Sequence, residues 1–280
     1  MIVDYSTARP SMAALRAAGV TAVGRYIGWD GEPGFASIGK NITRAEVDDL
    51  HAAGIAPFVS FEYAADAAAK GAGQGAKDGT LAWQQLRDLG APAGTASYYA
   101  VDFDIPDYAP KLPDTKASAL AKLGPVGSYF RAVNALKLPY RTGGYGGYYA
   151  IKRLFDAGLI VLGWQTVAWS GGQRDSRAQL YQTTGSQPIG GADLDIHEGT
   201  ATDFGQWKPP ASPPPGLPTL QQGMTGAAVK TLQAALNTHG YHLTVDGVFG
   251  PATEAAVVSF QKQHGLTADG VVGPLTWGKL

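Results

Sequence analysis

Carboxylic acids recur in this 280-residue chain at alternate positions of short apolar segments. The clearest case is the segment 97–105, in which Asp102 and Asp104 alternate with apolar residues. Because successive side chains of a strand point to opposite faces, both carboxylates share one face. The same alternation recurs in three other segments, with the acids Asp4, Glu62, Asp193 and Asp195. The pattern predicts several strands that carry acids on the same side of one sheet.

Paired carboxylates are the groups that hydrolyse glycosidic bonds. One protonates the departing oxygen, and the other attacks, activates water or orients an amide of the substrate. Acids that lie close together raise one another's pKa, which keeps one of them protonated near neutrality. The sequence therefore predicts a glycoside hydrolase site. The competing interpretation is that each acid caps a loop or pairs with a base such as Arg25.

Glycans also bind to aromatic surfaces. Aromatic residues lie at or just beyond the expected strand ends: Tyr26, Trp29, Tyr63, Tyr145, Tyr148, Trp164 and Trp169. Their distribution predicts a carbohydrate groove along one rim. The residues expected to contact the substrate are Arg25, Tyr63, Tyr145, Trp164, Gln165 and Asp195.

The elements that must position these side chains alternate along the chain. Strands are expected at 2–6, 22–27, 55–63, 97–105, 142–148, 159–166, 179–184 and 192–197. Helices are expected at 11–18, 43–53, 74–89, 116–136 and 149–157. This alternation predicts an α/β fold, a (β/α)₈ TIM-like barrel at the small end of its size range, with a doubly wound sheet as the alternative. In such a barrel the active site lies at the carboxyl ends of the strands, where the acids fall.

A proline-rich segment separates two parts of the chain. Six prolines between Pro209 and Pro218 exclude a helix or a central strand and favour extended polyproline II. The expected division is a barrel at 1–207, a linker at 208–218 and a small domain at 219–280. At about 3.1 Å per residue, the linker is a semi-rigid spacer on the order of 30 Å long.

The last sixty residues contain an internal repeat. The phrase Asp-Gly-Val-x-Gly-Pro-x-Thr occurs at 246–253 and again at 269–276. Each copy predicts a tight Asp-Gly turn followed by a helix that begins at the proline. With Val229, Leu232 and Leu236 at helical spacing, the segment is expected to form a small three-helix all-α domain. The order of glycines and apolar residues from Gly223 to Trp277 closely resembles the peptidoglycan-binding domain of bacterial and phage cell-wall enzymes. That resemblance implies a non-catalytic anchor on peptidoglycan.

The first part of the chain has a resemblance of its own. It is carried by Asp4-Tyr5-Ser6, by the segment 99–104, by Gly144-Tyr145-Gly146, by Trp164-Gln165 and by 192–195. These residues resemble a glycoside-hydrolase-like domain of unknown function found in actinobacterial secreted proteins and phage lysins. That group is similar to the family 25 lysozymes, which cleave between N-acetylmuramic acid and N-acetylglucosamine. The two domains together resemble a phage endolysin.

The resemblance implies roles for particular acids. The first-strand aspartate of the lysozymes matches Asp4, their last-strand aspartate matches Asp193, and their Asp-x-Glu strand matches Asp102 and Asp104. Asp104 departs from the family, because the lysozymes place their general acid there as a glutamate, one methylene longer. Either Asp104 or Glu62 is therefore the expected acid, with Glu198 as a weaker candidate. Asp102 is the expected base, nucleophile or orienting group, and Asp4 and Asp193 would tune the ionisation.

Composition limits the remaining classes of function. A net charge of −1 and the lack of a basic run predict neither a nucleic acid nor a membrane partner. The chain has no cysteine, and neither His197-Glu198 nor His239 and His242 has a third ligand at metal spacing, so we expect no metal and no cofactor. The first residues have no signal-peptide pattern, so a location outside the cell or in its wall would require a processed form or phage-encoded export.

We therefore expect a monomeric cell-wall glycosidase of the muramidase type that acts on bacterial peptidoglycan. Two alternatives remain at the level of sequence. One is a carbohydrate-binding wall protein whose barrel has lost efficient chemistry, and the other is a hydrolase of another actinobacterial envelope glycan.

Overall fold

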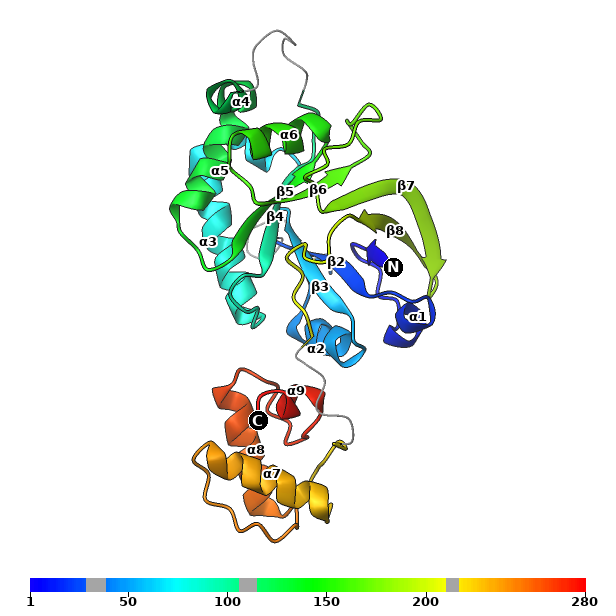
Figure 1. The fold of residues 1–280 in the computed structure, drawn as a ribbon, viewed down its shortest axis with the longest axis vertical. Helices are drawn as coiled ribbons and strands as arrows, with labels where there is room; N and C mark the ends of the chain where they lie inside the picture. Colours follow the sequence, from blue (N-terminus) through cyan, green and yellow to red (C-terminus); the bar gives the residue numbers. More distant parts are fainter. Residues whose placement is uncertain (29–38, 106–114, 210–216) are drawn as a thin grey trace. The chain divides into compact units, whose positions relative to one another are not determined.

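The computed structural model describes residues 1–28, 39–105, 115–209 and 217–280. Trp29 and most of the linker prolines lie outside these ranges. The chain forms two compact units, Met1–Lys208 and Pro209–Leu280 (Figure 1). None of the described helices combines the length and the apolar composition that crossing a bilayer requires.

The first unit is a closed barrel with helices around it (Figure 1). Its strands are β1 (Ile2–Asp4), β2 (Ala22–Ile27), β3 (Ala56–Phe61), β4 (Ala96–Val101), β5 (Arg141–Gly146), β6 (Leu162–Thr166), β7 (Leu180–Ile189) and β8 (Ala192–Gly199). Its helices are α1 (Met12–Ala17), α2 (Arg44–Ala52), the 3₁₀ helix η1 (Ala67–Lys70), α3 (Ala72–Asp88), α4 (Lys116–Leu123), α5 (Pro125–Ala135) and α6 (Tyr148–Asp156). The mixed α/β class and the closed barrel agree with the sequence-based prediction.

Local sequence explains where several helices begin. Ser11 and Thr43 accept hydrogen bonds from the backbone N–H groups three residues later and so cap α1 and α2. Thr115 and Ser118 form a capping box at the start of α4. The expected helix 116–136 is divided into α4 and α5 at Gly124, which has a positive φ of 52°.

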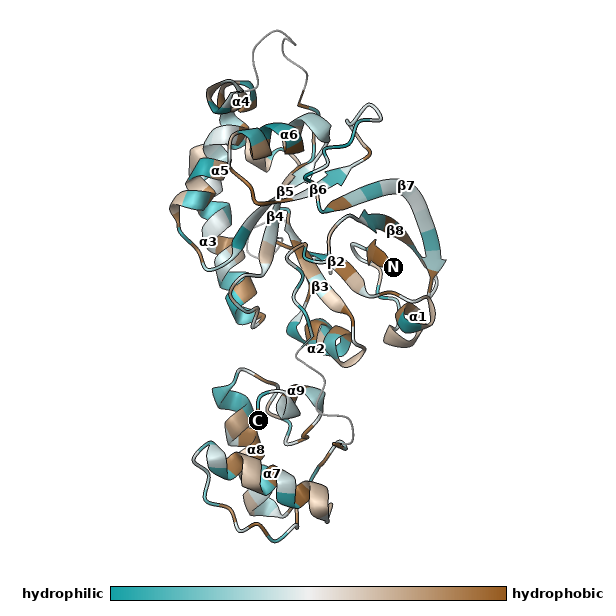
Figure 2. Cartoon of the chain, in the orientation of Figure 1, coloured by the Kyte–Doolittle hydropathy of each residue, from teal (hydrophilic) through white to brown (hydrophobic). Residues whose placement is uncertain are grey.

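Strand alternation divides the apolar residues into two layers. Outward residues such as Val3, Tyr99 and Val101 pack between the barrel and its helices. Inward residues such as Phe58, Tyr98 and Trp164 fill the barrel itself. The surrounding helices carry both hydrophobic and hydrophilic residues (Figure 2), as expected for elements with one buried face.

The direction of the last strand corrects the prediction of a strict (β/α)₈ alternation. Strands β1 to β7 pair in parallel, whereas β8 runs antiparallel to both β7 and β1. The cause is the turn Gly190-Gly191, in which both residues have positive φ and join Ile189 directly to Ala192. Two such glycines form a hairpin turn, which makes the following strand antiparallel. In the described residues, no helix lies between β6 and β7 either.

The second unit contains α7 (Ala227–Thr238), α8 (Pro251–Gln263) and α9 (Pro274–Trp277), which pack around one apolar core. α8 and α9 begin at the two prolines of the repeated phrase, as predicted. Leu220 exchanges two backbone hydrogen bonds with Val272, and Gly223 and Met224 bond to Phe249. Because Phe249 and Val272 occupy the same place in the two copies, the entering chain holds the copies together.

One buried glutamine holds each repeated turn. Gln233 donates to Asp246 Oδ1, to the Val248 carbonyl and to Thr253 Oγ1, and its own carbonyl accepts from Gly247 N. In the second copy, Gln261 makes the same four kinds of contact. Its partners are Asp269, Val271, Thr276 and Gly270. The sequence repeat is therefore a repeat of hydrogen-bond geometry.

Candidate active site at the mouth of the barrel

We call the end of the barrel at the carboxyl ends of β1 to β7 its mouth. Aromatic side chains fill the barrel below this mouth. The Phe58 and Trp164 rings lie 5.1 Å apart, and the Tyr98 hydroxyl donates to the Phe204 carbonyl at 2.6 Å. Phe204 belongs to the segment after β8 and packs into the same interior cluster. The interior is therefore packed below the level of the acids, and chemistry is restricted to the carboxyl ends of β1 to β7.

A buried acid and a buried histidine lie directly above this aromatic layer. His197 Nε2 lies 2.8 Å from Asp4 Oδ1, and the Tyr26 hydroxyl donates to Asp4 Oδ2 at 3.0 Å. Because a carboxylate only accepts, Nε2 of His197 carries the proton. Protein groups contact both carboxylate oxygens of Asp4. The side chain is 3% exposed, so the site is closed to solvent.

The network continues upward to Glu62. Lys40 Nζ lies 3.0 Å from Glu62 Oε1 and 4.2 Å from the centre of the Tyr26 ring. A second chain runs along the other side of the mouth, in which the Tyr145 hydroxyl donates to Gln182 Oε1 at 2.8 Å and Gln182 Nε2 donates to Asp195 Oδ2 at 3.0 Å.

Electrostatics shows that several of the predicted acids converge. Burial raises the pKa of the Tyr145 hydroxyl, and the negative charges of Asp102, Asp4 and Glu62 raise it further. Three carboxylates from β1 and from the residues after β3 and β4 therefore act on one ring from β5. Strand alternation had placed Asp4, Glu62 and Asp102 on the inward face of their strands.

Two acids at the mouth, Asp102 and Asp195, have raised pKa values. Burial raises the pKa of Asp102, while the positive charge of Lys40 opposes that shift. Partial burial and the charge of Asp4 raise the pKa of Asp195, while the hydrogen bond from Gln182 opposes it. A carboxyl with a raised pKa can act as a proton donor nearer to neutral pH.

Asp104 and Asp193 lie farther out. Both are exposed to solvent. Asp193 pairs with Pro188 in the β7–β8 hairpin. This pair lies closer to the hairpin turn than Asp195 does, on the far side of a register shift between Gln182 and Ser186. Glu198 is also exposed and pairs with Arg174 at 2.5 Å. It lies opposite Tyr181, away from the mouth, because β8 runs antiparallel.

Arg25 does not face the mouth, which corrects its prediction as a substrate contact. It is fully buried on the outer side of β2, with Nε 2.6 Å from Glu46 Oε1 on α2. Its guanidinium also donates to the Tyr5 and Ser6 carbonyls. Alternation explains this placement, because Gly24 and Tyr26 on either side point inward.

Three other residues that were predicted to contact the substrate instead pack in the core or support a loop. Trp164 is 1% exposed within the interior layer, with its ring 5.0 Å from that of Tyr145. Gln165 is fully buried and holds the loop after β6, donating to Ser170 Oγ and to the Gln173 carbonyl. Tyr63 is half-buried and packs against the outer apolar core. Tyr145 and Asp195 are the predicted contacts that lie in the mouth.

Sequence reasoning missed His197, Lys40 and Gln182 as members of the mouth network. A signal was present for His197, which alternates with Asp193 and Asp195 and so shares their face. Lys40 and Gln182 carry no such local signal. Among the described residues, no group of three or more histidine and acidic side chains is arranged to hold a metal ion.

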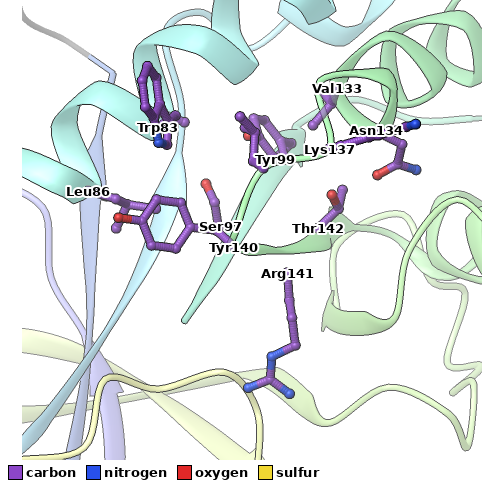
Figure 3. Close-up of a pocket in the computed structure, with 12 residues that line it drawn as sticks. Trp83, Leu86, Ser97, Tyr99, Val133, Asn134, Lys137, Tyr140, Arg141 and Thr142 are labelled. Atoms are coloured by element: carbon purple, nitrogen blue, oxygen red, sulfur yellow. The ribbon is translucent and has the colours of Figure 1, made fainter. Parts of the chain in front are cut away.

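A cavity lies outside the barrel wall, between β4 and β5 and the helices α3 and α5 (Figure 3). Ser97 and Thr142, near the amino ends of β4 and β5, line it together with Trp83 of α3 and Asn134 of α5. Its lining includes none of the predicted acids. The cavity is therefore separate from the acidic mouth.

Comparisons with known proteins match the two parts of the chain separately. Residues 13–201 match the model of the Rv2525c-like, glycoside hydrolase-like domain, and residues 225–280 match that of a putative peptidoglycan binding domain. The crystal structure of the Tat-secreted protein Rv2525c of Mycobacterium tuberculosis superposes with a TM-score of 0.61 at 25% identity, over 74% of this chain and 98% of that one.

The curated relatives match only the C-terminal part. A zinc D-Ala-D-Ala carboxypeptidase of Streptomyces albus G is 48% identical over 65 residues, which are 22% of this chain and 26% of the relative. An uncharacterized protein of Kitasatospora aureofaciens is 52% identical over 65 residues, 22% of this chain and 55% of the relative. The chain thus spans about a quarter and about half of the length of these two proteins.

Proposed function

The chain belongs to the Rv2525c-like, glycoside hydrolase-like family and carries a C-terminal peptidoglycan-binding domain, and we propose that its barrel hydrolyses the glycan strands of bacterial peptidoglycan. The observation that supports this most is the network at the barrel mouth. Tyr26 donates to Asp4, and Lys40 lies against Tyr26 and pairs with Glu62. The charges of Asp4, Glu62 and Asp102 also raise the pKa of the Tyr145 hydroxyl. Three carboxylates beside one half-buried aromatic ring fit acid-assisted cleavage of a sugar chain.

We assign the proton donor to Asp102. Burial raises its pKa, which keeps the carboxyl protonated at a higher pH than an exposed aspartate. Glu62, ion-paired with Lys40 from the segment between β2 and α2, is the second carboxylate and would activate water or stabilise positive charge on the sugar. Asp104, at the position that suggests a lysozyme-like acid, is the competing donor.

Asp4 has a positioning role in this proposal. Both of its oxygens accept hydrogen bonds from the protein, so it holds Tyr26 and His197 in place and adds negative charge beneath the sugar. Such charge stabilises an oxocarbenium-like transition state. Asp193 and Asp195 lie on the β7–β8 side and are available for contacts to sugar hydroxyls.

The C-terminal domain supports peptidoglycan as the substrate. An anchor on the cell wall holds the barrel at a high local concentration of glycan strands, so a substrate found in the same polymer is favoured over a soluble one. The match with a Tat-secreted protein supports action outside the cytoplasm or in the wall. Cleavage next to N-acetylmuramic acid, as in muramidases, is the specific reaction that we propose.

The test is digestion of purified peptidoglycan, followed by mass analysis of the released fragments. Wild type is compared with Asp102→Asn, Glu62→Gln and Asp104→Asn, and with Asp88→Asn as a matched control at an exposed site at the end of α3. We expect new reducing-end muramic acid from the wild type and the control. Loss in Asp102→Asn with retention in Asp104→Asn supports the assignment, and the reverse pattern transfers the donor role to Asp104.

A second candidate function is binding without hydrolysis. The observation that favours it is Lys40, whose ammonium lies against both Glu62 and Tyr26 and lowers the pKa of Asp102. A positive charge in the mouth lowers the pKa of a neighbouring carboxyl and so makes that carboxyl a poorer proton donor. If the wild type sediments with the wall and releases no fragment at any pH, the hydrolase proposal is wrong and carbohydrate binding replaces it.

A further inference from the structure

Trp169 has an unusual combination of backbone geometry and exposure. It lies in the loop after β6 with φ at 55°, in the left-handed region, and the residue is 39% exposed. Among the described residues other than glycine, only Lys137 shares a positive φ. A bulky residue in this region is disfavoured by steric contact with its own backbone. An exposed tryptophan held in such a conformation gains little from burial, which points to a role other than packing.

The neighbouring loop is built to accept this conformation. A Cβ at Gly147, just after β5, would lie 2.8 Å from Trp169 Cβ and 2.9 Å from the Trp169 carbonyl oxygen. A side chain at position 147 would therefore displace Trp169. Glycine at this position allows the two loops to approach so closely.

Ser170 fixes the loop immediately after the tryptophan. It is 2% exposed, and its hydroxyl accepts from Tyr148 N at 3.0 Å and donates to the Thr166 carbonyl at 2.5 Å. Gln165 completes the support, with Nε2 3.0 Å from Ser170 Oγ and Oε1 accepting from Asp175 N at 2.9 Å. Two buried and two partly buried hydrogen bonds thus hold a loop whose largest exposed side chain is Trp169.

The position of this loop connects it with the acids. Gly146 pairs with Val101, the residue before Asp102, and Gly147 follows it. Trp169 packs on Gly147, so its backbone lies at the carboxyl ends of β5 and β6, beside the strand that carries Asp102. Trp169 therefore places an exposed indole on the loop that follows β6, at the same end of the barrel as Asp102.

We infer that Trp169 is an aromatic platform on which one pyranose ring of a bound glycan strand stacks. The C–H groups on one face of an N-acetylhexosamine ring are apolar and pack against an indole, while its hydroxyl groups remain free to bond to acids such as Asp195. This inference rests on the proposed function only for the class of ligand, a chain of N-acetylated hexosamines, and does not require that the bond is cleaved.

Titration calorimetry with a soluble tetrasaccharide of alternating N-acetylglucosamine and N-acetylmuramic acid tests the platform. The full chain is used as wild type, Trp169→Ala, Trp169→Gly and Gly147→Ala, with Trp83→Ala on α3 as a tryptophan control outside the barrel wall. We expect at least about tenfold weaker binding in the three mouth variants and unchanged binding in the control. The C-terminal domain is present in every protein, so its contribution is common to all.

Thermal unfolding separates a platform from a packing residue. Trp169→Gly removes the positive-φ strain, so its Tm should equal or exceed that of the wild type while its binding falls. Equal affinity of Trp169→Ala and the wild type, or no binding by the wild type, overturns the inference. Weaker binding in the variants while the wild type releases no wall fragment leaves the platform standing and removes only the proposed hydrolysis.

Discussion

His197 Nε2 lies 2.8 Å from Asp4 Oδ1 inside the barrel, with neither side chain more than 3% exposed. The contact joins the first strand to the last, 193 residues apart in the chain. It lies where β8 meets β1 in antiparallel pairing and the barrel closes. One buried hydrogen bond therefore supports both the closure of the fold and the floor of the acidic mouth.

Removal of either partner of this pair should strongly destabilise the barrel. Asp4→Ala and His197→Ala should each lower the free energy of unfolding by about 3–5 kcal/mol, because each leaves a buried polar group without its partner. The double variant should cost clearly less than the sum of the two. Urea unfolding of the four proteins measures the cycle, and additive effects would show that the two residues act independently.

Arg25 should respond to substitution as a structural residue. Arg25→Lys removes the fork that contacts Glu46, Tyr5 and Ser6, and a buried ammonium cannot replace those contacts. We expect a loss of about 2–4 kcal/mol in unfolding free energy. The matched variant Arg87→Lys, at a site 58% exposed, should change stability by less than about 0.5 kcal/mol. Equal losses in the two variants would contradict the buried role of Arg25.

Asp102 should make stability depend on pH. Its pKa is higher in the folded than in the unfolded protein, so the folded state binds more protons between the two pKa values. Stability is therefore lost as the pH rises above the unfolded value near about 4. Asp102→Asn removes this loss, so the stability of the variant relative to the wild type should rise between the unfolded pKa and the raised folded pKa of Asp102 and stay constant above it.

Urea unfolding across that pH range measures the difference, with Asp88→Asn as the exposed control. Lys40→Met provides an independent check, because Lys40 lowers the pKa of Asp102. In that variant the Asp102 carboxyl, followed by NMR, should titrate at higher pH than in the wild type. A difference between Asp102→Asn and the wild type that does not vary with pH would rule out the raised pKa.

The two glutamines of the C-terminal unit should be energetically equivalent. Gln233→Ala and Gln261→Ala each leave the polar groups of one Asp-Gly turn without a buried partner, so each should cost about 2–4 kcal/mol. Wall binding in a sedimentation assay should fall in both. Gln263→Ala, on an exposed position of α8, serves as control and should change neither quantity. A large effect at one glutamine alone would contradict the structural equivalence of the two turns.

Much of the fold could be predicted because its signals are local. The alternation in 97–105 correctly placed Tyr98 inside the barrel and Tyr99 outside it, and the two prolines correctly marked the starts of α8 and α9. The same alternation, applied to Arg25 and Gln165, would have placed both on the outer face. Their prediction as substrate contacts was wrong because the type of residue was weighed above its position in the strand.

The depth of a side chain inside the barrel and the direction of a strand could not be predicted in the same way. Trp164 points inward as expected, but it belongs to the packed layer below the mouth, because its height is set by pairing with neighbouring strands. The periodicity of a strand is the same in either direction. Asp195 therefore lies at the mouth, and Glu198 away from it, only because β8 is antiparallel.

The sequence by itself determined the elements, the inward face of each strand, the acids carried on those faces and the repeated turns of the C-terminal domain, since each depends on residues near one another in the chain. Only the tertiary structure decided that His197 bonds to Asp4, that Lys40 pairs with Glu62 and that Trp169, rather than Trp164, is the exposed tryptophan. Those contacts depend on strand register, strand direction and close approach of loops, which arise only when distant segments pack together.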